Sequence, residues 1–338
     1  MIIFRFLVYI LLSVTVLNAN ENVLVTGGNG YIGLSTCRIL KEKGYTPVSV
    51  DNSSNSKIPT VSWGPTENGD ILDKKWLRSI FKKYKFVGII HLAAKIYVPE
   101  STEKPLLYYK ENVAGSLNVL ELAKEFQIKG LVFSSTCAVY GILESDTPVL
   151  ESQILSPLSP YAESKLVIER LIGFLWESDH IPSAILRYFN VSGVDSLTDN
   201  KDGHSAQLIP CLVKAFQQTP AEVQIFGTDY STEDGTCIRD YVHVVDVAKA
   251  NVKALEYILA EKKPIITNIG TGKGYTVKQI AESVSKYAKK EYKENCLPRR
   301  KGDVPIVVAD IGCAKQNFDW QPENSSLESI VGSYYGVS

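Results

Sequence analysis

Short apolar runs alternate with amphipathic stretches along the chain from Asn22 onward. The length and composition of the apolar runs predict buried strands at 23–26, 47–51, 86–92, 130–134 and 183–187. The stretches between them have the spacing of amphipathic helices, at 32–43, 74–84, 106–126 and 161–178. Strands that alternate with helices are typical of βαβ units. We therefore expect an α/β fold with a Rossmann-type doubly wound parallel sheet.

The sequence pattern changes after Arg187, where loops become more frequent and helices and strands less regular. Loops rich in Asp, Gly, Asn and Thr occupy 194–204 and 227–235, and between isolated helices lies one more predicted strand, IITNIG. We expect a nucleotide-binding Rossmann domain over 21–187 and a smaller, less regular substrate-binding lobe over 188–338. No long linker or internal repeat separates the two parts.

The first nineteen residues are almost wholly apolar, apart from Arg5, Ser13, Thr15 and Asn18. The segment is at the short end for a bilayer span, which needs ~20 apolar residues, and only Arg5 offers the positive charge of a signal peptide. Two interpretations therefore stay open for 1–19: a signal or membrane anchor, and a start-site extension or packed helix.

Composition excludes several classes of function. Lys and Arg number 36 against 37 for Asp and Glu, and no basic block occurs, so a nucleic-acid partner is not expected. The six cysteines are scattered without a C-x-x-C pair or a histidine at ligand spacing. We therefore expect reduced thiols, with neither a metal site nor a disulfide framework.

The segment VLVTGGNGYIG carries the strongest single motif. Gly27, Gly30 and Gly33 lie directly between a predicted strand and a predicted helix. Glycines permit a tight turn and close backbone approach, while the helix N-terminus offers free N–H groups to a pyrophosphate. Asp51 ends the next strand, where a carboxylate accepts hydrogen bonds from ribose hydroxyls and repels a 2′-phosphate. The pattern predicts a dinucleotide site that prefers NAD to NADP.

A second group of residues indicates proton transfer. Tyr161 and Lys165 in SPYAESKL are four residues apart and so share one face of a helix. Thr136 ends an earlier strand, at the edge where doubly wound sheets bind ligands. A phenol with a reference pKa of ~10 is a poor base at neutral pH. We expect the Lys165 ammonium and the positive nicotinamide ring to favour the phenolate of Tyr161.

Several segments occur in the order seen in UDP-glucose 4-epimerases, a family of extended short-chain dehydrogenases/reductases that the chain resembles from Asn22 to Gly332. They are TGGNGYIG, HLAAKIYVPES, SSTCAVYG, SPYAESK, RYFNVSG, IFGTDYSTEDGTCIRDYVHVVDVA and PRRKGDVP. The resemblance implies tightly held NAD and a nucleotide-sugar substrate. It implies that Tyr161 removes the C4 hydroxyl proton during transient oxidation to a 4-keto sugar. Lys165 and Thr136 assist, and the sugar then turns over and is reduced on its other face.

The resemblance also implies the binding residues. For NAD, besides the three glycines, they are Tyr31, Ile32, Asp51, Asn52, Asn55, Ser56, Asp70, Ile71, Ala93, Ala94, Lys95, Asn112, Ser134, Tyr161, Lys165 and Phe189. For the UDP-sugar they are Thr136, Asn190, Leu208, Gln224, Phe226, Arg239, Arg300, Asp303 and Val307. The chain departs from many relatives in having Thr136 for serine, which keeps the hydroxyl. It also departs at Lys95, which sits one place earlier than in some members of the family.

Charge and size support some of these assignments independently. Arginine matches phosphate oxygens bidentately, so Arg239 and Arg300 suit a diphosphate. The resemblance implies that Val307 corresponds to the position beside the sugar C2 substituent, where a small residue leaves room for an N-acetyl group. An ordinary strand valine is an equal alternative, because strands favour β-branched residues. His243, which alternates with apolar residues, is expected to be structural.

Two other classes of function share parts of this pattern. Nucleotide-sugar 4,6-dehydratases and UDP-glucuronate decarboxylases have the same Tyr/Lys pair, but they resemble Thr-Asp-Glu or Thr-Ser-Glu where this chain has Thr136, Cys137 and Ala138. The chain thus lacks their acidic residue there. A non-catalytic dinucleotide-binding regulator is the remote alternative. The favoured function is C4 epimerisation of UDP-glucose and UDP-galactose, with UDP-N-acetylhexosamines as further candidates.

Two expectations concern the setting of the enzyme in the cell. The family resemblance alone implies a homodimer. The need for NAD and the unpaired cysteines favour the cytoplasm, with membrane tethering through 1–19 as the alternative.

Overall fold

The computed structural model describes residues 20–337 apart from 55–61, 143–146, 199–206 and 301. Its centre is a seven-stranded parallel sheet in the order β10-β6-β5-β4-β1-β2-β3. The strands are β1 (Asn22–Thr26), β2 (Thr46–Asp51), β3 (Thr66–Asn68), β4 (Phe86–His91), β5 (Leu131–Thr136), β6 (Ser183–Tyr188) and β10 (Ile265–Ile269). The chain order reverses between β1 and β4, so the expected doubly wound parallel sheet is confirmed.

Apolar residues on both faces of the strands explain why helices cover the sheet on two sides. Within β1, Val23 and Val25 pack on one side and Leu24 on the other, and all three are fully buried. Burial of one such side chain contributes about 1.5–3 kcal/mol. One side carries α1 (Tyr31–Glu42), α8 (Val244–Glu261) and α10 (Gly312–Phe318); the other carries α2 (Lys74–Tyr84), α5 (Gly115–Glu125) and α6 (Pro160–Asp179).

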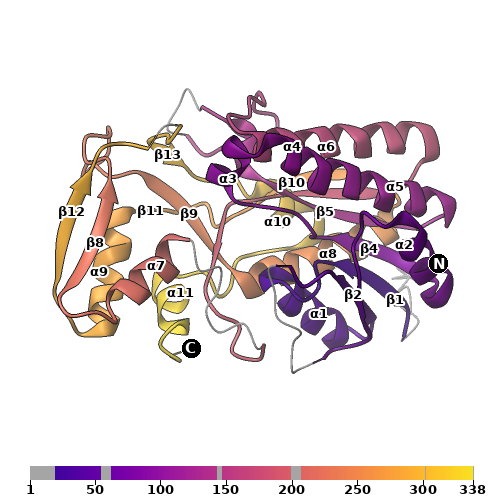
Figure 1. Cartoon of the computed structure of the whole chain (residues 1–338), viewed down its shortest axis with the longest axis horizontal. Coiled ribbons are helices and arrows are strands. Elements are labelled where there is room, and N and C mark those ends of the chain that lie inside the picture. The colour runs from indigo at the N-terminus through magenta and orange to yellow at the C-terminus, as the bar shows by residue number, and fades with distance from the viewer. Residues whose placement is uncertain (1–19, 55–61, 143–146, 199–206, 301, 338) are drawn as a thin grey trace, which may run out of the picture.

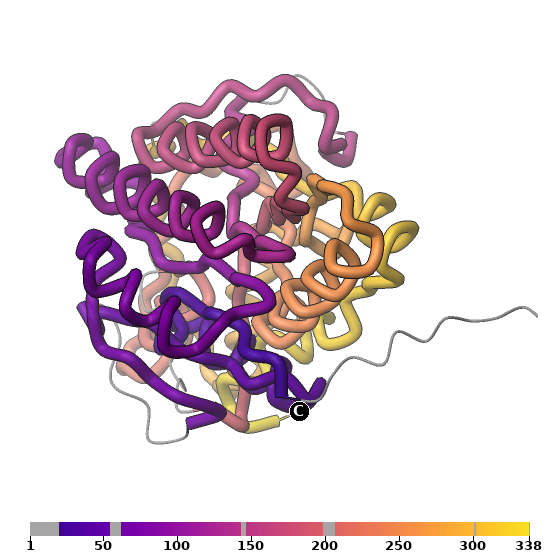
Figure 2. The backbone as a smooth tube through the Cα atoms, turned by 90° about the vertical axis from the view of Figure 1, so that its right-hand side faces the viewer, coloured from indigo at the N-terminus to yellow at the C-terminus, as the bar shows by residue number. Residues whose placement is uncertain are grey.

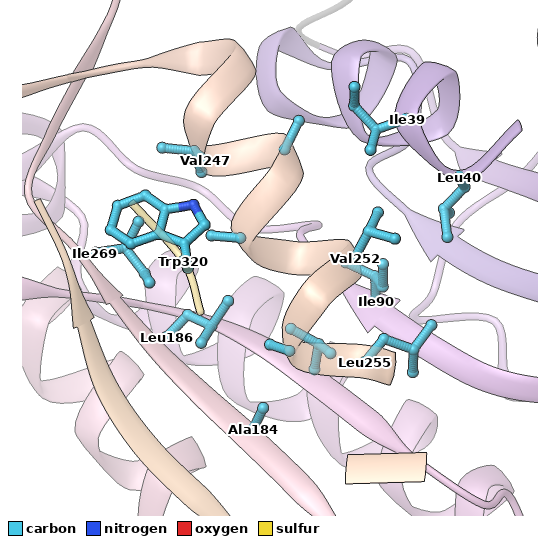
Figure 3. Packing of buried hydrophobic residues seen from close by; sticks show 14 of the residues in the cluster. Ile39, Leu40, Ile90, Ala184, Leu186, Val247, Val252, Leu255, Ile269 and Trp320 are labelled. Carbon is cyan, nitrogen blue, oxygen red and sulfur yellow. The ribbon is translucent and has the colours of Figure 1, made fainter. Parts of the chain in front are cut away.

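The figures show these layers directly. In Figure 2, α2, α5 and α6 lie to one side of the sheet and the orange helix α8 to the other. Figure 3 shows the second side, where Val247, Val252 and Leu255 of α8 face the sheet near Ile39 and Leu40 of α1. Trp320 packs in the same layer, and its indole N–H donates to the backbone oxygen of Asp246 at 2.9 Å.

Two features differ from the sequence prediction. The predicted helix 106–126 is divided into α4 (Pro105–Tyr108), a π-helical turn η1 (Tyr109–Ala114) and α5. In addition, β10 and α8 lie after residue 187 but belong to the central sheet and its cover. A boundary at residue 187 therefore does not follow the sheet. β10 and α8 bury their apolar faces by packing with the central sheet, although they come later in the chain than its other strands.

The remaining elements form a smaller lobe at one end of the sheet (Figure 1). Strands β7 (Asn190–Ser192), β9 (Ile238–His243), β11 (Gly274–Thr276) and β13 (Ile306–Val307) form one sheet, and β8 (Ala221–Phe226) pairs with β12 (Tyr292–Leu297). Helices α7 (Leu208–Ala215), α9 (Val277–Ala288) and α11 (Leu327–Ser333) pack around a separate apolar cluster. The short helices α3 (Val98–Glu103) and η2 (Cys137–Tyr140) follow β4 and β5.

Within the described part of the chain, we find no helix with the length and apolar character needed to cross a bilayer. The N-terminal segment 1–19 lies outside the described residues. Cys37, Cys137, Cys237, Cys296 and Cys313 are free thiols in the described part of the chain.

Candidate functional site

The glycine turn between β1 and α1 leaves no space for side chains. Gly27 has φ +71°, and a Cβ there would lie 2.9 Å from the backbone nitrogen of Ala93. A Cβ on Gly33 would lie 2.1 Å from the Gly27 oxygen. Gly30 is the N-cap of α1 and makes no side-chain capping bond. The free N–H groups of the first helical turn are therefore accessible to an anion.

Polar groups beside this turn fit a dinucleotide. The Asp51 carboxylate ends β2 and accepts a hydrogen bond from the Asn29 backbone at 3.1 Å. The Asn29 side chain accepts from Ser49 Oγ at 2.9 Å, but its Nδ2 is buried without a partner. An orphaned buried donor in a glycine turn is what a phosphate-binding loop supplies to its ligand. The residues present therefore fit NAD.

Other predicted cofactor residues surround the same edge of the sheet. Ala93, Ala94 and Lys95 directly follow β4, and the Asn112 side chain pairs with both backbone groups of Lys95, at 2.8 and 3.0 Å. Asn52 donates to Asp70 at 2.9 Å, and Ile71 packs beside Gly115. Ile32 starts α1, and Phe189 follows β6. Asn55 and Ser56 lie outside the described residues.

Tyr31 has a partner that the sequence did not indicate. Its buried hydroxyl donates to the backbone oxygen of Gly193 at 2.5 Å. Because Gly193 follows β7, this bond ties the first turn of α1 to the smaller lobe. The Tyr31 hydroxyl therefore connects the Rossmann part of the molecule with the smaller lobe.

The structure brings Thr136, Tyr161 and Lys165 together. Thr136 ends β5, and Ser159 caps α6 by accepting from the Ala162 backbone at 3.2 Å, so Tyr161 and Lys165 lie in the first turns of that helix. Tyr161 is hydrogen-bonded to Thr136. Lys165 Nζ donates to the Ser134 backbone oxygen at 2.8 Å and lies 4.9 Å from the Phe133 ring centre.

Burial dominates the electrostatics of this pair. It raises the pKa of Tyr161 to about 12, against the opposing effect of the Thr136 hydrogen bond. It lowers the pKa of Lys165 to about 7, while the Glu169 carboxylate acts to raise it. In the protein without cofactor the pKa of Tyr161 is thus raised, and the expected combined effect of the Lys165 ammonium and the nicotinamide ring stays a prediction. The ammonium is directed to the Ser134 carbonyl, and removal from water outweighs its charge.

The sequence analysis did not predict a buried ion pair that includes Glu169, one helical turn after Lys165. Glu169 lies four residues after Lys165 on α6 and accepts from the Arg187 guanidinium through both oxygens, at 3.1 and 2.7 Å. Ser135 also donates to this carboxylate. Arg187 in turn donates to the Tyr140 hydroxyl at 3.1 Å. The i, i+4 spacing from Lys165 to Glu169 was the available signal.

A second group of predicted residues gathers on the smaller lobe. Arg300 Nε donates to the Asp303 carboxylate at 2.9 Å, and Arg239 Nη2 lies 3.8 Å from the same group. The Arg300 guanidinium sits 5.3 Å from the Phe226 ring centre. Gln224 precedes Phe226 on β8, while Asn190 and Leu208 begin β7 and α7. Two cations and one carboxylate can bind a phosphate and a ribose hydroxyl.

Val307 connects this group with the catalytic one. In β13 it is the register partner of Arg239 in β9, and it packs in one buried cluster with Phe189 and Val139. Val307 is only 8% exposed. His243 caps α8 by accepting from the Val245 backbone at 3.2 Å, which confirms its predicted structural role.

Comparisons with known proteins agree with this site. Residues 23–270 match the model of the NAD dependent epimerase/dehydratase family. The chain belongs to this family. It is 40% identical over 306 residues to a UDP-glucose 4-epimerase of Rhizobium meliloti (strain 1021), covering 90% of this chain and 93% of the relative. It is 37% identical over 319 residues to the UDP-glucose 4-epimerase of Homo sapiens, covering 89% and 91%.

Solved structures give the same result. The crystal structure of UDP-glucose 4-epimerase from Brucella ovis in complex with NAD superposes with a TM-score of 0.86 at 36% identity, covering 93% of this chain and 97% of that one. The UDP-Glc/GlcNAc 4-epimerase from Campylobacter jejuni gives 0.82 at 32% identity, covering 94% and 98%. The predicted activity, NAD-dependent epimerisation at C4 of a UDP-hexose, is confirmed, and the lyase alternatives are not favoured.

Proposed function

We propose that the chain interconverts UDP-glucose and UDP-galactose with Tyr161 as the proton-transfer group. The observation that supports this best is the contact of Tyr161 with Thr136 at the carboxyl edge of the sheet, next to the glycine turn. Doubly wound sheets bind ligands at this edge. A phenol and a hydroxyl on one sugar oxygen can hold it while its proton moves.

The cofactor lies along the glycine turn in this proposal. Gly27, Gly30 and Gly33 leave room for the pyrophosphate, the Asn29 amide donates to it, and Asp51 accepts from the adenosine ribose. Lys165 and Asn112 hold the nicotinamide end. NAD held by these residues would supply reversible hydride transfer at C4 and a positive charge that favours the Tyr161 phenolate.

The chain's own residues manage the proton. Tyr161 takes the C4 hydroxyl proton and later returns it, and Thr136 orients the reacting oxygen. Lys165 favours the phenolate, and Glu169 favours the charged form of Lys165. Burial alone disfavours both the Tyr161 phenolate and the Lys165 ammonium. In this proposal the charged forms are therefore populated only when substrate and cofactor are bound and water is excluded.

The UDP group serves as the fixed anchor while the 4-keto sugar turns over. Arg239 and Arg300 bind the diphosphate, Asp303 accepts from the ribose, and Phe226 lies beside the base together with Gln224, Leu208 and Asn190. Val307 leaves space at the sugar C2 position. We therefore include UDP-N-acetylglucosamine among the substrates, a breadth that the printed name of the Campylobacter jejuni relative shares.

Product analysis tests the proposal against its rivals. Purified protein is incubated with UDP-galactose without added NAD, and the products are separated. We expect UDP-glucose as the product. Reversible oxidation at C4 does not need the acidic residue that the lyases have after the threonine, where this chain has Cys137 and Ala138. A dehydrated sugar would assign the protein to the lyases, and no conversion despite bound NAD would favour the regulator.

We further propose a homodimer in the cytoplasm, with the NAD part formed by 21–187 together with β10 and α8. Support for the dimer comes from apolar side chains exposed on neighbouring helices: Leu106 on α4, Tyr109 on η1, Leu117 on α5 and Phe174 on α6. Cell fractionation tests the location. Full-length protein recovered only from membranes with detergent would instead show an anchor in 1–19.

A further inference from the structure

Tyr230 carries a buried hydroxyl that has no hydrogen-bond partner. The residue is 5% exposed and lies in the turn between β8 and β9. Buried hydroxyls are nearly always paired, and one left unpaired destabilises the protein that contains it. Such an atom is retained most readily where a ligand completes it.

The contacts around Tyr230 fix its ring in place. Its backbone N–H donates to Gly235 at 2.9 Å, and its backbone oxygen accepts from Thr232 at 2.8 Å. The Arg299 guanidinium covers the ring at 4.1 Å from its centre. Gly227 abuts the ring so closely that a Cβ there would lie 2.5 Å from it. The phenol therefore has little freedom to seek another partner.

Tyr230 lies next to the group proposed to bind UDP, because its ring contacts Gly227 and Arg299, the chain neighbours of Phe226 and Arg300. Burial raises the pKa of Tyr230, the Asp303 charge raises it further, and Arg299 and Arg239 oppose the shift. Two of these residues, Arg239 and Asp303, were assigned above to UDP. The phenol thus keeps its proton at neutral pH and stands as a neutral donor among the groups that receive the nucleotide.

We propose that the Tyr230 hydroxyl donates a hydrogen bond to a diphosphate oxygen of the bound UDP-sugar. This inference rests on the proposed function, since it takes the Arg239–Asp303–Arg300 group as the UDP site. Tyr230 would then be a binding residue that is unsatisfied in the free protein and satisfied in the complex. Binding and stability should consequently respond in opposite directions when the hydroxyl is removed.

The test is Tyr230→Phe, with UDP binding measured by calorimetry and unfolding measured without UDP. We expect the dissociation constant for UDP to rise about 10- to 100-fold, the range for a hydrogen bond to a charged group. We expect the Tm of the UDP-free protein to rise by roughly 1–3 °C, because an unpaired buried hydroxyl is gone.

Tyr45→Phe is the matched control. Tyr45 is 2% exposed and also has a buried hydroxyl without a partner, but it precedes β2 at the opposite edge of the sheet. This variant should gain stability and keep its affinity for UDP. An unchanged dissociation constant in Tyr230→Phe would overturn the inference, as would an equal loss in Tyr45→Phe. Failure of the unaltered protein to bind UDP would instead overturn the proposed site.

Discussion

At the scale of single residues, the site combines groups whose burial opposes their task. Tyr161 and Lys165 are both shifted towards their neutral forms. The nearest charged partner of Lys165 is Glu169, itself held by Arg187. In the proposed mechanism, activity therefore depends on charges that arrive with the ligands and on the few polar contacts that orient the phenol.

Tyr161→Phe tests the role of the phenol. We expect turnover of UDP-galactose to fall by about 10² to 10⁴, the usual contribution of a general acid–base group. Bound NAD, measured by absorbance after denaturation, should remain, because cofactor contacts are spread over many residues. A variant that keeps more than half of the original activity would exclude Tyr161 as the base.

Val307→Tyr tests the pocket beside the sugar. Because Val307 is buried next to Arg239 and Phe189, a larger ring should exclude an N-acetyl group while leaving room for a hydroxyl. We expect kcat/KM for UDP-N-acetylglucosamine to fall by at least tenfold relative to UDP-glucose, or roughly 1.4 kcal/mol in discrimination. Equal losses for both sugars would indicate an ordinary core valine.

At the scale of elements, short segments place these residues. The glycine turn orients the N-terminus of α1 towards the crevice, and the Ser159 cap sets the start of α6. A buried chain from Thr26 through His91 to Ser116 joins β1, β4 and α5, with distances of 2.6 and 2.8 Å at the two ring nitrogens. Each of these local features depends on only a few residues.

Two glycine substitutions separate a required glycine from a tolerant one. Gly33→Ala should lose NAD and about 1–3 kcal/mol of stability, because its Cβ would lie 2.1 Å from the Gly27 oxygen. Gly173→Ala, within α6 and with no atom within 4 Å of its Cβ, should gain about 0.5–1 kcal/mol. Urea unfolding and NAD content measure both. Normal NAD content in Gly33→Ala would contradict the proposed cradle.

His91 makes stability depend on pH. Burial and the charge of Lys165 lower its pKa to about 3 from 6.5, so the unfolded chain binds this proton first as the pH falls. Stability is thus complete above pH 6.5 and lost between 6.5 and 3. From pH 7.5 to 5.5 the unaltered protein should lose about 1 kcal/mol more than His91→Gln in urea unfolding. Parallel losses would show that His91 is not responsible.

At the scale of the whole molecule, the two parts share structure. The bond from Tyr31 to Gly193 and the ion pair of Arg38 with Asp195 at 2.9 Å both join α1 to the segment after β7. The Gly193 backbone N–H also donates to the hydroxyl of Tyr334, at the end of α11, at 3.2 Å. These contacts fix the position of the glycine turn and α1 relative to the smaller lobe.

Leu106→Glu tests the proposed dimer. Leu106 is 84% exposed on α4, so a charge there should not affect the fold but would be buried unpaired in a dimer. Sedimentation should change from dimer to monomer, with unchanged circular dichroism. Ile266→Glu, at a side chain 41% exposed on β10, is the control that should remain dimeric. A dimeric Leu106→Glu variant would locate the interface elsewhere.

The sequence by itself determined the sheet, the glycine turn and the residue types of the site. Periodicity places β1, β2, β4, β5 and β6 within a few residues, because a strand buried on both faces must be apolar throughout, whereas it did not predict the short polar edge strand β3. Spacing also put Tyr161 and Lys165 on one helix face. These features are local, so the order of residues is sufficient to predict them.

Only the tertiary structure decided which distant groups meet. It added β10 to the sheet and α8 to its cover, paired Glu169 with Arg187, and left the buried Tyr230 hydroxyl without a partner. It also showed that burial raises the pKa of Tyr161 in the cofactor-free protein, because desolvation depends on everything packed around a group and not on its neighbours in the chain. Burial and long-range pairing are properties of the folded molecule, and no local pattern encodes them.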